Sequence, residues 1–274
     1  RTYDLRVRQH TPPTPGQPHK EPLHIPLALG LLDRQGRDLP LRLAGEDVAP
    51  AARTRVLEVR EPEQVFRFVE VPEPPLPSLL RGFSAPVKVR FDYGDEELLT
   101  LMAQDSDGFN RWEAAQTLSQ RLLLTLMADP GRPIPAGYVA AFRRALADTR
   151  AEPALLAEIL TLPSESYLAD QMELVDVEGI HRARETLTAG IATELRGELL
   201  AVYARLRETG PYEPSPEAIG RRALKNLCLA YLAAAGDAAE RADGGRGAAA
   251  LDLGGNDRTQ VATRTDLQPC IERA

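Results

Sequence analysis

Hydrophobic and polar residues alternate along the first part of the chain. From Tyr3 to Val7 every second side chain is apolar, which is typical of a half-buried strand. The apolar run 23–32 ends in a glycine-containing turn at 33–36, and the run 39–43 is its expected hairpin partner. Further short strands are predicted at 54–59, 64–71 and 87–93. Six or seven short strands with no helical pattern between them predict an antiparallel β-sandwich over residues 1–96.

After Gly94 the apolar residues recur at steps of three or four instead of two. Acidic residues at 95–97 suit the start of a helix, and Leu98, Leu101 and Met102 share one helical face. Further helices are predicted at 108–127, 135–148, 153–162, 176–207 and 216–235. Residues 97–236 are therefore expected to form an α-solenoid or an irregular bundle of helix pairs, and no exact internal repeat decides between the two.

The final segment, residues 237–274, differs from both domains. It contains no aromatic residue, few large aliphatic residues and two glycine pairs. This is too little apolar surface to offset the entropy of ordering, so we expect a divergent or disordered tail.

Composition excludes several classes of protein. The 274 residues carry 33 Lys and Arg against 40 Asp and Glu, a formal charge of -7, without a basic block that would bind nucleic acid. No apolar run approaches the roughly 18 residues of a membrane span, so the chain is expected to be soluble. Cys228 and Cys270 fit a reducing, cytoplasmic setting. Of the 23 prolines, 14 lie in residues 1–96, and the chain begins with Arg1, which suggests two unlike parts of a larger or processed polypeptide.

Histidines are the usual metal ligands and catalytic bases, but none has a recognisable spacing here. The zinc-peptidase pattern HExxH needs two histidines four residues apart with a glutamate after the first. Neither His24 nor His181 is followed by glutamate, and His10 and His19 lie in or beside a proline-rich loop. No metal ligand is predicted.

Other possible sites have simpler explanations. The string 105–110 is similar to the start of a calcium loop but lacks its glycine and glutamate positions, so Asp107 is interpreted as a helix N-cap. The string 82–86 lacks the last glycine of a serine nucleophile elbow. Acid pairs at Glu61 and Glu63 and at Glu96 and Glu97 are interpreted as solvated charges. The residues alone predict no catalytic, cofactor-binding or metal site.

Several strings in order carry a family resemblance. They are Lys20-Glu-Pro-Leu-His-Ile-Pro26 with the turn Asp33-Arg-Gln-Gly36, Phe83-Ser-Ala-Pro-Val-Lys88, Arg111-Trp-Glu-Ala-Ala-Gln116, Ala157-Glu-Ile-Leu-Thr-Leu-Pro-Ser164 and Arg222-Ala-Leu-Lys-Asn-Leu-Cys-Leu229. Together they resemble the C-terminal half of bacterial aminopeptidase N, a zinc-dependent alanyl aminopeptidase of the gluzincin type. After Ala235 the resemblance ends, either through natural divergence or through a frame change or damaged gene end.

The resemblance implies an immunoglobulin-like sandwich followed by a truncated solenoid of armadillo-like helix pairs. The family's HExxH helix, its downstream glutamate ligand and its Gly-Ala-Met-Glu-Asn segment have no counterpart here. The zinc and the peptide substrate thus belong to the parent enzyme, and this chain is expected to be inactive alone. Its expected role is that of a spacer and partial active-site cover, with the missing catalytic domain as its partner.

Two other functions stay open. One is an independent module that binds a peptide or protein on its helical surface. The other is a self-sufficient enzyme with an unrecognised site. A truncated helical domain would also expose an apolar face around 216–235.

Overall fold

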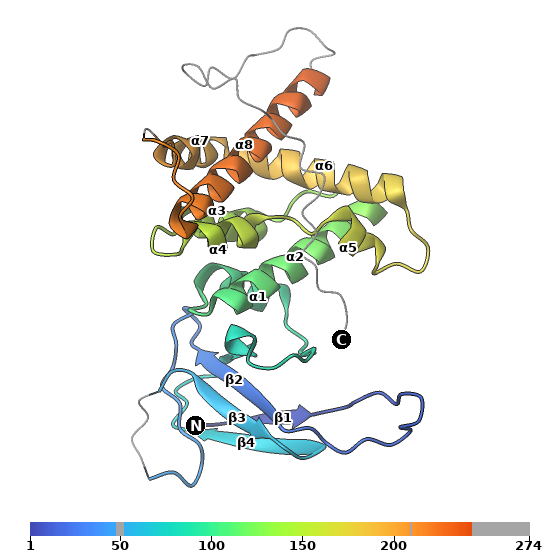
Figure 1. The fold of residues 1–274 in the computed structure, drawn as a ribbon, viewed down its shortest axis with the longest axis vertical. Coiled ribbons are helices and arrows are strands. Elements are labelled where there is room, and N and C mark those ends of the chain that lie inside the picture. The colour runs from blue at the N-terminus through green and yellow to red at the C-terminus, as the bar shows by residue number, and fades with distance from the viewer. Residues whose placement is uncertain (48–51, 209, 243–274) are drawn as a thin grey trace.

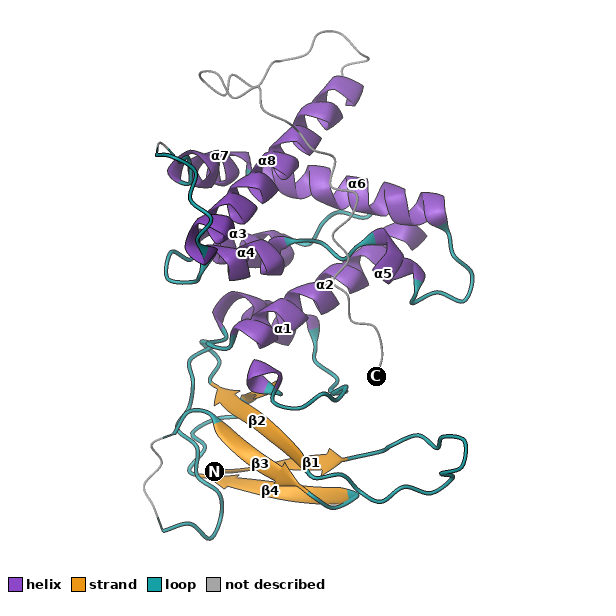
Figure 2. Cartoon of the chain, in the orientation of Figure 1, coloured by secondary structure: helices purple, strands orange, loops and turns teal. Residues whose placement is uncertain are grey.

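The strands and the helices occupy opposite ends of the molecule. The computed structural model describes residues 1–47, 52–208 and 210–242, with the side chains of 237–242 left aside. Figure 1 shows the strands at one end, the helices stacked at the other, and the connection that leads into α1 between them. The elements are coloured by type in Figure 2.

The described strands form two antiparallel sheets that enclose one apolar core. In the first sheet β1 pairs with β4, and in the second β2 lies between β3 and β5. The central β2 is buried along nearly its whole length, which explains why its sequence is a continuous apolar run instead of an alternating one. The core includes Leu5, Leu29, Leu31, Leu57 and Phe68. The bounds are β1 Thr2–Arg8, β2 Ile25–Leu32, β3 Arg55–Val59, β4 Glu63–Val69 and β5 Leu76–Leu79.

Two predicted strands are absent, and one strand was not predicted. The run 39–43 forms no hairpin strand, because it crosses between the sheets: Leu39 donates its amide to Leu31 of β2, whereas Leu43 bridges to Phe68 of β4. The run 87–93 joins the domains with local backbone bonds and no ladder. Conversely, the sequence analysis missed β5, whose Pro77 is tolerated because β5 is an edge strand.

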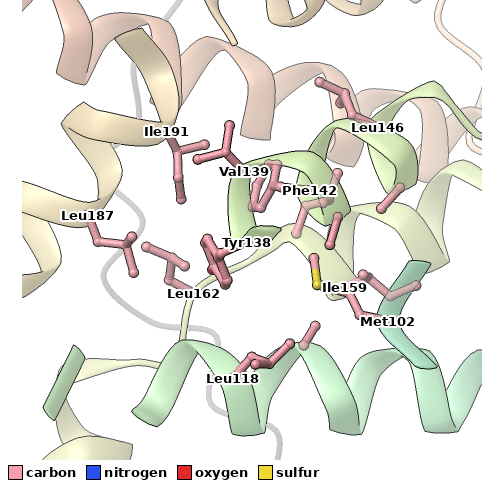
Figure 3. Packing of buried hydrophobic residues seen from close by; sticks show 14 of the residues in the cluster. Met102, Leu118, Tyr138, Val139, Phe142, Leu146, Ile159, Leu162, Leu187 and Ile191 are labelled. Carbon is pink, nitrogen blue, oxygen red and sulfur yellow. The ribbon is translucent and has the colours of Figure 1, made fainter. Parts of the chain in front are cut away.

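The helices pack around a second and larger core. α8 lies against α4, α6 and α7, whereas α2 contacts α1, α4 and α6. Figure 3 shows buried side chains that converge from several helices, among them Met102, Leu118, Tyr138 and Phe142. The helices are α1 Asp95–Gln104, α2 Gly108–Ala128, α3 Ala136–Ala147, α4 Pro153–Leu160, α5 Glu165–Ala169, α6 Val177–Glu194, α7 Arg196–Arg205 and α8 Pro216–Ala242.

The longest predicted helix, 176–207, is two helices in the structure. α6 ends and α7 begins around Leu195, whose backbone leaves the helical region at φ −116 and ψ 18. The break lets the two halves meet different neighbours, since α6 packs on α2 and α7 packs on α3. An ion pair of 2.7 Å between Arg143 and Glu198 joins α3 to α7. Periodicity could not reveal the break, because the fully buried Leu195 keeps the apolar spacing.

The end of the chain departs from two expectations. Most large apolar residues of α8 are buried, among them Leu224, Cys228, Tyr231 and Leu232. Ile219, at the start of the helix, is more than half exposed. The apolar face expected around 216–235 is thus limited to a narrow strip, in which Ile219, Ala223 and Ala230 are exposed. α8 continues to Ala242, beyond its predicted end, and the rest of the expected tail, 243–274, lies outside the described residues.

Candidate functional site at the domain junction

A buried arginine occupies the junction between the sandwich and the helices. Arg81 follows the end of β5 in a single 3-10 turn, η1 (Arg81–Phe83), and its side chain is only 3% exposed. The backbone around it is unusual, because Leu80, Gly82 and Phe83 all have positive φ, at 59, 60 and 51. For non-glycine residues such angles cost about 1–3 kcal/mol each and persist only where the surrounding structure enforces them. The surrounding structure therefore enforces strained angles at Leu80 and Phe83, the residues on either side of the Arg81–Gly82 pair.

The guanidinium of Arg81 is satisfied from both domains. Its Nε donates to Ser78 Oγ at 2.8 Å, and its Nη1 donates to Thr54 Oγ1 at 2.8 Å. Its Nη2 donates to Asp38 Oδ1 at 2.6 Å and to Asp105 Oδ1 at 3.2 Å. Asp38, Thr54 and Ser78 belong to the sandwich, whereas Asp105 ends α1, so one charged group links the two domains.

The guanidinium lies directly against the backbone of β2. A Cβ atom added to Gly30 would overlap the Cζ, Nη1 and Nη2 atoms of Arg81. Glycine is required at this position for close approach, because any larger residue would displace the arginine.

Two aspartates organise the turn between α1 and α2. Asp105 accepts the Asp107 amide at 2.9 Å, and Asp107 accepts the amides of Asn110 at 3.0 Å and Gly82 at 2.9 Å. Burial raises the pKa of Asp105, and its Oδ2 atom has no hydrogen-bond partner among the described residues. The predicted N-cap role of Asp107 is confirmed. The same residue also anchors η1, which the sequence analysis did not foresee.

Apolar side chains interlock across the junction as well. Leu32 and Leu76 belong to the sandwich strands but are part of the helical core, whereas Phe109 of α2 packs on the sandwich core. Phe109 also contacts the rings of Phe83 at 5.3 Å and Trp112 at 5.9 Å between centroids. Each core thus includes or contacts side chains from the other domain's elements, so ionic and apolar contacts both join the two domains.

The chemistry of this site is that of a structural link. Each guanidinium nitrogen of Arg81 donates a hydrogen bond to a side-chain oxygen. Over residues 1–47, 52–208 and 210–242 there is no group of three or more His, Cys, Asp or Glu side chains that could hold a metal ion. The described residues therefore do not fit a zinc site, and we assign no zinc ligand to them.

The four histidines do not lie on one structural element. His10, His19 and His24 are exposed at or near the loop between β1 and β2. His181 is exposed on α6, where its Nδ1 lies 2.9 Å from Glu165 of α5, and the hydrogen bond to Glu165 raises the pKa of this imidazole.

The two cysteines differ in what can be said of them. Cys228 is a buried free thiol, as predicted, and burial raises its pKa to about 12. Cys270 lies outside the described residues.

Sequence reasoning missed Arg81 and its partner Asp38, and treated Asp105 only as part of a calcium-like string. One signal was available: Arg81 interrupts an apolar run at the end of a strand, and a charge in such a position is typically buried with a partner. The identity of the partners depends on contacts between residues 24 and 43 positions apart, which no local pattern reveals.

In the part of the chain that the structure describes, no helix is long and apolar enough to cross a membrane.

Comparison with family models covers both domains. Residues 1–92 match the domain of unknown function DUF3458, described as an Ig-like fold. Residues 95–248 match its C-terminal companion DUF3458_C, described as ARM repeats. The predicted order, an immunoglobulin-like sandwich followed by armadillo-like helices, is confirmed.

Known proteins match over most of the chain. Aminopeptidase N of Escherichia coli (strain K12) is 41% identical over 235 residues, which cover 84% of this chain and 26% of that protein. Aminopeptidase N of Haemophilus influenzae is 37% identical over 236 residues, which cover 85% and 26%. Among solved structures, the crystal structure of Legionella pneumophila aminopeptidase A in complex with aspartic acid matches with a TM-score of 0.70 and 26% identity, over 88% of this chain and 27% of that one. The chain thus spans about a quarter of the length of the relatives it matches.

Proposed function

The chain belongs to the DUF3458 family and is homologous to the C-terminal part of bacterial aminopeptidase N, and from that premise we propose that it is a non-catalytic component of a zinc-dependent aminopeptidase. In this proposal the parent enzyme releases N-terminal amino acids from peptides. The present chain is the spacer and part of the cover of its active-site chamber, and the catalytic domain is its partner. A cytoplasmic location belongs to the same proposal and is supported by the low cysteine content.

The observation that carries the proposal is the similarity to aminopeptidase N across both domains. The 235 matched residues cover the sandwich and most of the helices, so the relation is to a two-domain unit and not to one domain. None of the four histidines is followed by glutamate, so the sequence has no HExxH pattern. Zinc in the parent family would activate water for attack on a peptide bond, and no step of that reaction is assigned to residues of this chain.

The junction supports the role of a spacer. Domains in one chain move relative to each other by default, unless their interface is large and hydrophobic or otherwise fixed. Here the buried Arg81 bonds Asp38 and Asp105 from opposite domains, and Phe109 and Leu32 cross the boundary in both directions. A rigid arm of this kind would hold the helices at one angle to whatever the sandwich is attached to, as a chamber cover requires.

A chimera tests the proposal. In full-length E. coli aminopeptidase N, the matched region is replaced by the corresponding residues of this chain, and hydrolysis of an alanine anilide is measured together with zinc content. We expect a folded, active chimera, and loss of activity when the region is deleted. The purified 274-residue chain, assayed in parallel, should show no turnover. A folded but inactive chimera would contradict the role within an aminopeptidase, and zinc-dependent turnover by the isolated chain would contradict a non-catalytic role.

A further inference from the structure

A hollow of about 300 Å³ lies where α7 ends and α8 begins. Its wall carries three arginines from three parts of the chain: Arg205 in the last turn of α7, Arg207 in the connection and Arg221 in the second turn of α8. We call it the α7–α8 hollow. Hollows of about 300–1,000 Å³ that carry a few convergent polar groups are typical of small-ligand sites.

The acids of this wall do not balance its arginines. Among the described residues, the carboxylates of the lining are those of Glu208 and Glu213. Glu208 lies 3.9 Å from Arg221 but 3.2 Å from Arg222, so its charge is shared between two guanidinium groups of α8. The wall of the α7–α8 hollow therefore carries an excess of positive charge.

Arg205 and Arg207 hold most of this excess. Both residues are exposed, and neither forms an ion pair with a residue in the part of the chain that the structure describes. A cation in the last turn complements the helix dipole, which explains Arg205 on structural grounds. It does not explain why Arg207, beyond that turn, and Arg221, on another helix, line the same hollow. Guanidinium groups suit phosphate and carboxylate groups, to which they donate paired, charge-assisted hydrogen bonds.

We propose that the α7–α8 hollow binds a small oxyanion, a phosphate or carboxylate group, through Arg205, Arg207 and Arg221. The inference goes beyond the proposed function and does not depend on it. The three arginines select the charge of the ligand, because an anion gains several charge-assisted hydrogen bonds whereas a cation is repelled. Since the arginines stay in contact with water, we expect a dissociation constant on the order of 1 mM.

Titration calorimetry of the full 274-residue chain tests the site with two doubly charged probes, inorganic phosphate and succinate. Each is titrated at pH about 8 and at an ionic strength held constant with sodium chloride, so that screening does not change during the titration. The test variants are Arg207→Gln and Arg205→Gln. The matched control is Arg196→Gln, which removes the same charge from an exposed position at the opposite end of α7.

We expect at least one of the two probes to bind saturably at a single site. Arg207→Gln should weaken that binding by about tenfold or more, because it removes charge-assisted donors from the wall. Arg205→Gln should cause a similar loss, and it keeps the test decisive if circular dichroism shows that Arg207→Gln does not fold. The Arg196→Gln chain should bind as the unchanged chain does.

The selectivity between the probes identifies the ligand group. Binding of phosphate alone would define a phosphate site and binding of succinate alone a carboxylate site, and either result, with the loss in Arg207→Gln, supports the proposal. No saturable binding of either probe would overturn it. Equal weakening by Arg207→Gln and Arg196→Gln would also overturn it, because the effect would then come from net charge and not from the α7–α8 hollow.

Discussion

Replacement of Arg81 by methionine removes the charge that joins the two domains. Methionine keeps a similar apolar stem but none of the donors that reach Asp38 and Asp105. The Asp105 side chain has no exposed surface, and one of its oxygens already has no partner among the described residues. The variant would therefore leave two neighbouring carboxylates without their shared cation.

The expected loss of stability is large. Breaking a buried ion pair by removing one partner costs about 3–5 kcal/mol, because an uncompensated charge is left behind. An exposed pair contributes about 0–1 kcal/mol. Arg143, which pairs with Glu198 where both side chains are more than 40% exposed, therefore provides a matched arginine control.

Urea denaturation of the full chain, followed by circular dichroism and by the fluorescence of Trp112, measures the free energy of unfolding. Arg81→Met should lower it by about 3–5 kcal/mol, and Arg143→Met by less than about 1 kcal/mol. Trp112 reports on the junction and dichroism is dominated by the helices, so coincidence of the two curves checks that unfolding is two-state and that the two free energies can be compared. A loss at Arg81 no greater than at Arg143 would refute the assignment of Arg81 as the link.

The pH dependence provides a second check. Burial raises the pKa of Asp105, so the folded state binds its proton more tightly than the unfolded state does. The contribution of Asp105 to the free energy of unfolding therefore falls as pH rises above about 4, the ordinary pKa of an aspartate. Without Arg81 the pKa rises further, so the difference between Arg81→Met and the unchanged chain should be smaller at pH about 4 than at pH about 7.

Three other predictions concern single positions. Gly30→Ala should destabilise the chain by about 1–3 kcal/mol in urea denaturation, because its Cβ would overlap the buried guanidinium, whereas Gly197→Ala, in open space on α7, should stabilise it by up to about 1 kcal/mol; equal effects would contradict the close approach. Asp107→Ala should cost about 1–2 kcal/mol through the lost helix cap, and an unchanged unfolding midpoint would argue against that role. His181 has a raised pKa because it bonds to Glu165, so its stabilising effect is present below about pH 6.5 and is lost as pH rises through the folded pKa; His181→Ala should lower the melting temperature at pH about 5.5 and have no effect at pH about 9, and a pH-independent effect would refute the pairing.

The accuracy of the sequence predictions follows the range of the interactions involved. Helix starts such as that of α2 were predictable, because a cap such as Asp107 acts within three residues of itself. The run 39–43 was misread, because its apolar residues suit a strand while its backbone bonds are divided between two sheets. The break at Leu195 could not be predicted for a similar reason. The apolar stripe is continuous in the sequence, but its first half, in α6, packs on α2 and its second half, in α7, packs on α3.

By itself the sequence determined the two-part organisation, the family and most element positions, because periodicity, proline placement and capping are local properties that the chain carries wherever it folds. The tertiary structure alone decided that Arg81 joins Asp38 to Asp105 across the domains, and that three arginines of α7, α8 and their connection line one hollow. Burial and charge pairing depend on residues brought together from distant parts of the chain, and the spacing of residues along the sequence does not indicate which of them will be neighbours.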